Sequence, residues 1–85
     1  MSKKDMIILI SSSGASKNII KAAKYCNLKS INLITFSGFK KNNLLSKYGK
    51  VNFYINSKQY NFIEMSHHII LVYLVDYFAK NKLNI

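Results

Sequence analysis

Short apolar runs alternate along this chain with segments of helical periodicity. Residues 6–10 are apolar at every position, which is typical of a strand buried on both faces of a parallel sheet. A helix of about ten residues is expected next, capped by Ser16 or a neighbour and ending near Asn27. Residues 30–35 and 51–55 predict two further strands.

The second half of the chain continues this alternation. Residues 43–47 predict a short helical turn that Gly49 ends, and residues 60–80 predict a long, mostly apolar helix. The order β-α-β-α-β-α is typical of an α/β fold with a parallel sheet and right-handed crossovers. We find no repeats or linkers, so residues 1–85 form a single small domain.

A loop rich in hydroxyl groups follows the first predicted strand. Four of the six residues from Ser11 to Ser16 are serines: Ser11, Ser12, Ser13 and Ser16. The free N–H groups and the dipole of the following helix favour an anion there, and hydroxyl groups add donors for phosphate oxygens. Ser37 and Gly38 follow the second strand, so both loops should lie at one edge of the sheet and face one ligand. The pattern predicts a phosphate site, with an ordinary polar turn and helix cap as the alternative.

The last predicted helix contains a carboxylate close to both histidines of the chain. His67 and His68 follow Glu64 by three and four residues, which places all three on one side of a helix. A carboxylate and an imidazole can transfer protons at neutral pH. The alternative is a structural hydrogen bond between Glu64 and a histidine inside an apolar helix. Metal binding is disfavoured, because adjacent helical residues point about 100° apart.

Composition excludes several classes of protein. The single cysteine, Cys26, excludes an internal disulfide and a multi-cysteine zinc site. The net charge of +10 comes from 13 lysines that are spread along the chain, and the chain has no arginine. This pattern favours a solvated basic surface over a nucleic-acid-binding surface, and the charge would attract anionic substrates. The longest apolar run, residues 69–75, is shorter than the roughly 20 residues of a membrane span, and no signal peptide is recognised. We expect a cytoplasmic protein without membrane contact.

The last helix is too apolar for a three-stranded sheet to cover, so part of it should pack on another chain or on a missing part of the domain.

Residues 5–22, with the serine-rich loop at their centre, resemble the phosphosugar-binding segment of SIS (sugar isomerase) domains. The likeness continues through Ser37-Gly38-Phe39 and through residues 60–68. It is closest to the phosphoheptose (sedoheptulose 7-phosphate) isomerase branch and its relatives in surface-polysaccharide pathways. The resemblance implies a flavodoxin-like α/β sandwich that works as a dimer or tetramer.

The same resemblance implies roles for individual residues. The four serines would bind the sugar phosphate through hydroxyl groups and backbone amides. Glu64 stands where the phosphoheptose isomerases have a polar active-site residue, usually glutamine, and His67 matches a histidine of the same helix. Val72 stands where these enzymes have a catalytic histidine, which His68 would replace. Complete SIS domains have an N-terminal half before the serine loop, so residues 1–85 resemble the C-terminal half alone.

The function implied by the resemblance is phosphosugar binding and aldose–ketose isomerisation, in the manner of sedoheptulose 7-phosphate isomerase. The reaction needs no redox cofactor, and the family admits a divalent metal such as zinc. Expected partners are a phosphorylated sugar and either further copies of the chain or a complementing N-terminal half. The alternatives are a non-catalytic phosphosugar-binding module, a dimeric adaptor, or an inactive truncated fragment.

Overall fold

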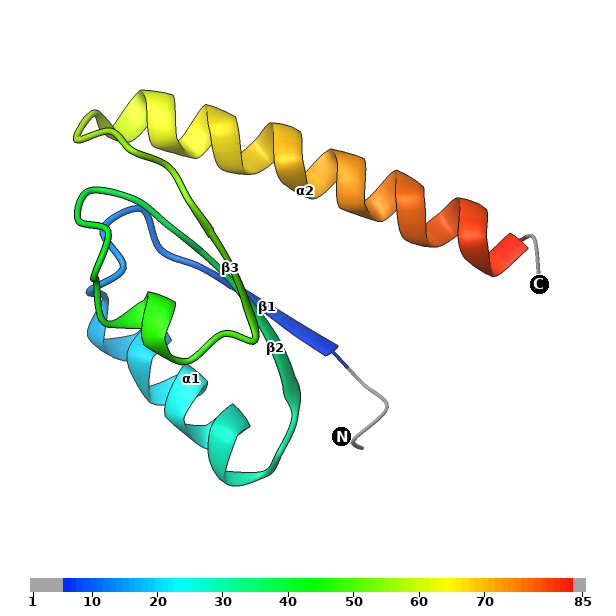
Figure 1. The fold of residues 1–85 in the computed structure, drawn as a ribbon, viewed down its shortest axis with the longest axis horizontal. Helices are drawn as coiled ribbons and strands as arrows, with labels where there is room; N and C mark the ends of the chain where they lie inside the picture. The colour runs from blue at the N-terminus through cyan, green and yellow to red at the C-terminus, as the bar shows by residue number, and fades with distance from the viewer. Residues whose placement is uncertain (1–5, 84–85) are drawn as a thin grey trace.

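The computed structural model describes the backbone of residues 6–83 and the side chains of residues 6–80. Its elements, in chain order, are β1 (Met6–Ile10), α1 (Lys17–Leu28), β2 (Asn32–Ser37), the 3₁₀ turn η1 (Leu45–Lys47), β3 (Val51–Tyr54) and α2 (Tyr60–Leu83). The strands form one parallel sheet in the order β1-β2-β3. The helices α1 and α2 lie on opposite faces of this sheet (Figure 1). The predicted α/β fold with a parallel sheet is confirmed.

The bounds of several elements differ from the prediction, and those of β2 differ most. Helix α1 continues one residue beyond Asn27, and the chain then reverses at Ser30, which has a φ of 56°. Strand β2 consequently starts later than predicted and includes Phe36 and Ser37, which the prediction placed after the strand. The local pattern could not show this, because Ser37 is a polar residue in a strand position whose side chain is buried.

The hydrophobic core lies between the sheet and α1. Residues three positions apart on α1 point at the sheet, as the helical period requires. They meet the apolar side of β2 and a leucine from η1. The buried cluster consists of Ile20, Ala23, Cys26, Ile31, Leu33 and Leu45. This face of the sheet is therefore closed by the chain's own residues.

Strand β1 is less buried than its sequence predicts. It pairs with β2 along one edge, and in the described part of the chain no strand pairs with its other edge. Met6 and Ile10 remain 42% and 40% exposed, so the expectation of burial on both faces is wrong for this sheet. An all-apolar strand of this kind suits an inner position in a larger sheet.

Among the described residues, only the start of α2 covers the opposite face of the sheet. Ile63 and His67 are buried there. A helix of 24 residues is roughly 36 Å long, which exceeds the length of these short strands. Figure 1 shows its later turns running past the sheet. Six apolar residues of those turns are 43–66% exposed: Ile69, Val72, Tyr73, Val75, Tyr77 and Phe78. The expectation that this helix exceeds what three strands can cover is confirmed.

The segment Tyr60–Lys80 of α2 is long and apolar enough to cross a membrane, with a mean hydropathy of 1.2. The longest unbroken apolar run in the sequence is therefore shorter than the apolar segment of α2. Length and composition alone are weak evidence of a span, and 11% of this window is buried in the structure. The first turns of α2 pack on the sheet through Ile63 and His67, and this packing together with the α/β fold favours a soluble protein.

Candidate functional site

The serine-rich loop is held in shape by its own hydroxyl oxygens. The Ser11 N–H donates to Phe36 O at 2.9 Å, which continues the pairing of β1 with β2. The chain turns at Gly14, whose φ is 69° and whose N–H donates to Ser11 Oγ at 3.1 Å. The Ala15 N–H donates to Ser13 Oγ at 3.2 Å. Since these oxygens accept, the hydroxyl hydrogens of Ser11 and Ser13 are still able to donate to a ligand.

Helix α1 begins directly after this loop without a side-chain cap. Ser16 occupies the N-cap position, is exposed and makes no capping hydrogen bond, and the first turn contains no acidic residue. The N–H groups of a first helical turn have no partner within the helix. Together with the helix dipole they attract an anion. Ser12 is half-buried in the same loop. The four predicted phosphate-binding serines thus lie together at one helix N-terminus.

The loop after β2 lies against the serine loop, as predicted from the parallel topology. A Cβ atom added to Gly38 would lie 2.9 Å from Ser12 O and 2.7 Å from Ile63 Cδ1, so only glycine fits between the serine loop and α2. The Leu45 N–H donates to Gly14 O at 3.0 Å and ties η1 to the same loop. The carboxyl ends of β1 and β2 therefore form one surface.

Asn43 connects these two loops, a role that the sequence pattern did not predict. Its side chain is 7% exposed and packs against Gly14. Asn43 Nδ2 donates to Ser37 Oγ at 2.9 Å and to Lys40 O at 2.7 Å, and Oδ1 accepts from the Ser46 N–H at 2.9 Å. The available signal was a polar segment after the second strand, which does not distinguish Asn43 from the exposed Asn42.

A second asparagine supports the same region from β3. Asn52 Oδ1 accepts hydrogen bonds from Thr35 Oγ1 at 2.5 Å and from Ser37 Oγ at 3.3 Å. Thr35 and Ser37 are completely buried, so their hydroxyl groups need these partners. The Ser37 hydroxyl accepts from Asn43 and donates to Asn52, which links the end of β2 to its loop and to β3.

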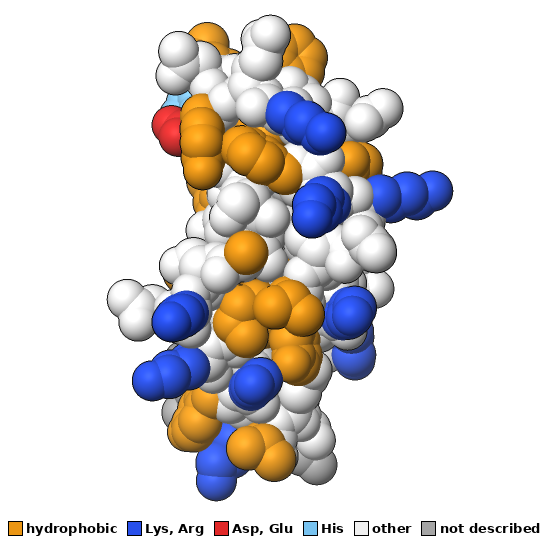
Figure 2. Space-filling model, turned by 90° about the vertical axis from the view of Figure 1, so that its left-hand side faces the viewer, with side chains coloured by type: hydrophobic (Ala, Val, Ile, Leu, Met, Phe, Trp, Pro, Cys, Tyr) orange, Lys and Arg blue, Asp and Glu red, His pale blue; other side chains and the backbone are white. Residues whose placement is uncertain are grey.

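A pocket of about 400 Å³ opens between the two loops. Its lining comes from the serine loop and from the segment after Gly38: Ser13, Ala15, Phe39, Lys40, Asn42, Asn43 and Leu44. Figure 2 views the molecule from the side on which these loops lie and shows lysines spread over that side, with an apolar patch among them. The pocket therefore offers hydroxyl, amide and ammonium donors beside the start of α1.

The three residues predicted to transfer protons do not share one environment. His67 is 2% exposed, and its Nε2 lies 2.8 Å from Ser37 O. A carbonyl oxygen only accepts, so we assign the proton of the neutral ring to Nε2. Its Nδ1 atom is buried without a hydrogen-bond partner. Glu64 and His68 are exposed, and in the part of the chain that the structure describes no hydrogen bond or ion pair joins Glu64 to either histidine.

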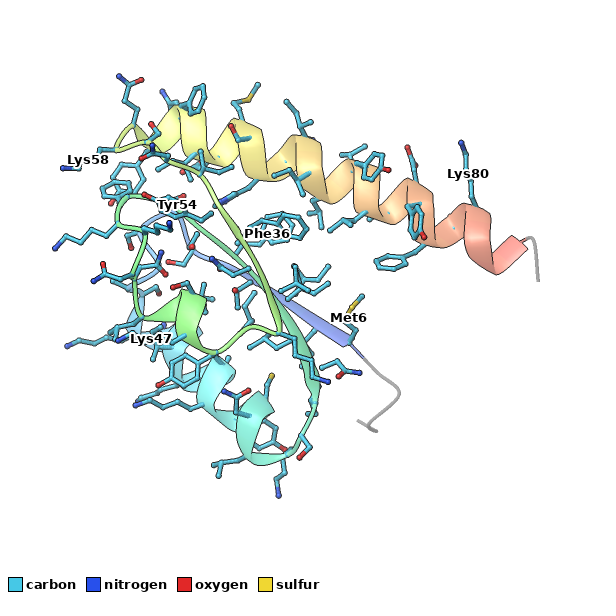
Figure 3. All side chains as sticks on the ribbon, viewed as in Figure 1. Met6, Phe36, Lys47, Tyr54, Lys58 and Lys80 are labelled. Carbon is cyan, nitrogen blue, oxygen red and sulfur yellow. The ribbon has the colours of Figure 1, made fainter. Side chains whose placement is uncertain are left out.

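His67 instead packs within the interface between α2 and the sheet. Its ring meets Phe36 edge-on, with centroids 5.4 Å apart at an interplanar angle of 84°. Figure 3 shows Phe36 in the space between the strands and α2. The Ser37 carbonyl that His67 binds also accepts from the Ile55 N–H at 3.0 Å. His67 thus joins α2 to the ends of β2 and β3.

The described residues do not fit a metal centre. Among residues 6–83, no three His, Cys, Asp or Glu side chains come together in a way that could hold a metal ion. His67 Nε2 is engaged by a backbone carbonyl, which removes one of the two histidines from consideration. We therefore derive no chemical step through a metal.

No curated protein matches this chain in sequence. Among solved structures it is similar to a phosphoheptose isomerase from Francisella tularensis, with a TM-score of 0.78 and 23% sequence identity. The match covers 88% of this chain and 42% of that chain, so this chain spans less than half the length of that protein. The likeness shows a shared fold, consistent with part of a flavodoxin-like sandwich. The family model for the SIS domain matches residues 1–75, and the chain therefore belongs to the SIS domain family.

Proposed function

We propose that this chain binds a phosphorylated sugar at the serine loop and contributes to its aldose–ketose isomerisation. The observation that supports this most directly is the uncapped N-terminus of α1 beneath four serines in a member of the SIS family. Hydroxyl groups, backbone N–H groups and the helix dipole there all favour the phosphate dianion. The substrate we propose is sedoheptulose 7-phosphate or a close relative, used in making heptose precursors of surface polysaccharides in the cytoplasm.

In the proposed reaction, the bound phosphate fixes the sugar so that its carbonyl end reaches acid–base groups. A base removes a proton from the carbon beside the carbonyl, and the resulting enediol takes up a proton on the neighbouring carbon. Aldose and ketose therefore interconvert without net oxidation. Glu64 and His68 are exposed on α2 and are our candidates for proton transfer. For the buried His67 we propose a positioning role, through its bond to the Ser37 carbonyl.

We further propose that this chain corresponds to the C-terminal half of a SIS domain. Two open surfaces support this: the free edge of β1 and the exposed apolar face of α2. A complementing N-terminal half would extend the sheet at β1 and cover α2, and further copies of the chain would also bury the later turns of α2. The similar phosphoheptose isomerase is more than twice as long as the matched part. Isomerisation then requires the completed domain.

A second candidate function is phosphosugar binding without chemistry, as a sensor or a dimeric adaptor. The observation in its favour is the separation of His67 from Glu64 and His68, together with Val72 at the position where the resemblance places a catalytic histidine. The phosphate site at the serine loop is the same in both proposals. They differ in whether the completed domain turns over its ligand.

The first experiment is thermal unfolding of the chain with sedoheptulose 7-phosphate and, as a matched control, with sedoheptulose lacking the phosphate. A ligand at 100 times its Kd stabilises the folded state by about 2.7 kcal/mol, which raises Tm by roughly 10–20 °C in a domain of this size. We expect this rise only with the phosphorylated sugar. Equal Tm values with both sugars and without ligand would refute the binding proposal.

Turnover is tested separately in the domain completed by an N-terminal half. Glu64→Ala should abolish isomerisation while leaving the affinity for the phosphosugar nearly unchanged, because it removes the basic carboxylate and leaves the serine loop intact. If the completed wild-type domain binds the phosphosugar but does not isomerise it, the result would favour the non-catalytic module. Loss of affinity together with turnover would contradict a role for Glu64 in proton transfer.

A further inference from the structure

A lysine that the family resemblance did not identify lines the pocket beside the serine loop. This residue, Lys40, is exposed and is the charged residue among those that line the pocket with Ser13 and Ala15. The two described acidic residues, Glu64 and Asp76, both lie on α2 outside this lining. No ion pair in the described part of the chain engages Lys40. Its ammonium group is therefore available to a ligand.

The backbone that carries Lys40 is fixed on both sides. Phe39 has a φ of 63°, a left-handed conformation that is unfavourable for a bulky residue. Three contacts hold it there. The Phe39 N–H donates to Ser57 O at 2.9 Å, the Tyr54 hydroxyl donates to Phe39 O at 3.1 Å, and the Phe39 ring lies 4.8 Å from that of Tyr60. Figure 3 shows Tyr54 at this end of the molecule.

The other side of Lys40 is held by Asn43, whose Nδ2 donates to Lys40 O at 2.7 Å. The same asparagine packs on Gly14 of the serine loop. The position of Lys40 relative to the serine loop is therefore set by the protein's own contacts before a ligand arrives. A strained residue held by three neighbours beside a pocket is typical of a binding site. Preorganisation of this kind lowers the ordering cost of binding.

We propose that Lys40 binds the phosphate group of the ligand, so that the anion site is formed by both loops. The inference rests on the proposed phosphosugar function and adds a residue to it. Serine hydroxyls and helix N–H groups are neutral donors, whereas a lysine ammonium contributes a full positive charge and a charge-assisted hydrogen bond. Lys40 thereby sets the preference for phosphorylated over neutral sugars, and the affinity depends on ionic strength.

The test compares Lys40→Met with Lys41→Met. Both lysines are exposed and both variants lose one charge, but only Lys40 lines the pocket. Affinity is measured by calorimetry with sedoheptulose 7-phosphate and, separately, with inorganic phosphate, at low and at physiological salt. We expect Lys40→Met to weaken both ligands by roughly 10-fold or more at low salt, and Lys40→Arg to restore most of that loss. Lys41→Met should stay within about two-fold of wild type.

Stability and wild-type binding separate the outcomes. The Tm of the unliganded Lys40→Met variant should equal that of Lys41→Met, which shows that lost affinity does not come from unfolding. If wild type binds and the two variants bind equally well, Lys40 has no role in the site, while the phosphosugar proposal stands. If wild type binds neither sedoheptulose 7-phosphate nor phosphate, the proposed function itself fails, and the role of Lys40 fails with it.

Discussion

Replacing Asn43 with alanine should destabilise the protein far more than the same change at its neighbour Asn42. The Asn43 side chain is buried and makes hydrogen bonds to Ser37 Oγ, Lys40 O and the Ser46 N–H, at 2.7–2.9 Å. Asn42 is exposed. The two residues have the same chemistry and adjacent positions, so their comparison isolates the buried network.

The magnitude follows from these contacts. A typical hydrogen bond contributes about 0.5–1.5 kcal/mol net, so three give roughly 1.5–4.5 kcal/mol. Ser37 keeps Asn52 as a partner, and the groups of Lys40 and Ser46 are only partly buried, so water can replace some of the loss. We therefore expect a loss of about 2–3 kcal/mol in the free energy of unfolding, or roughly 10–20 °C in Tm. Asn42→Ala should stay within about 0.5 kcal/mol.

The assay is urea unfolding followed by circular dichroism for wild type and both alanine variants. An unchanged m-value allows the shift in midpoint to be read as a change in stability. Asn43→Asp adds a second test, because it keeps the shape and the acceptor for Ser46 but removes the donor to Ser37 and Lys40. It should destabilise at least as much as Asn43→Ala. If Asn43→Ala shifts the midpoint no further than Asn42→Ala, the proposed link between the loops is refuted.

Three further predictions concern other contacts. His67→Ala should lower the free energy of unfolding by about 2–4 kcal/mol in urea unfolding, because it removes a buried ring and the donor to Ser37 O; an effect no larger than that of the exposed His68→Ala would contradict this packing. Gly14→Ala should lower Tm strongly, because the new Cβ would overlap the Asn43 side chain at a φ of 69°; an unchanged melting curve would show that the loop differs from the structure. Ile69→Lys changes a residue on the exposed side of α2 and should alter the free energy of unfolding of the monomer by no more than about 0.5 kcal/mol. The added charge should weaken self-association or binding of an N-terminal half, as measured by sedimentation velocity. Unaltered assembly would place the interface elsewhere.

Much of the fold could be predicted from local patterns. Met6–Ile10 and the start of α2 at Tyr60 were predicted at their observed positions, because an abrupt change between polar and apolar residues marks each boundary. The extent of β2 could not be predicted. Ser37 is polar, yet it is buried in the strand because Asn43 and Asn52 satisfy its hydroxyl, and these partners lie 6 and 15 residues away. Such a tertiary hydrogen bond leaves no periodic signal in the sequence.

The candidate site was predictable in its loops and less so in its helix. Parallel topology alone places the ends of β1 and β2 together, and the close approach of Gly38 to Ser12 confirms this. On α2, spacing gave the relation of His67 and His68 to Glu64 but not the direction in which each faces. The sheet takes Ile63 and His67, four residues apart on one stripe, and thereby leaves Glu64 on the exposed side.

The two faces of the sheet suggest that binding and catalysis are separable in this protein. The face toward α1 is closed by the chain's own core, and that side also carries the serine loop, Asn43 and Lys40. The face toward α2 is closed only near Ile63 and His67, and the proposed proton-transfer residues lie on the exposed surface of that helix. The proposed phosphate site therefore depends on contacts that are already present, whereas the position of Glu64 relative to a sugar depends on whatever covers α2. We accordingly expect phosphosugar affinity to survive in the chain alone and turnover to appear only when α2 is covered.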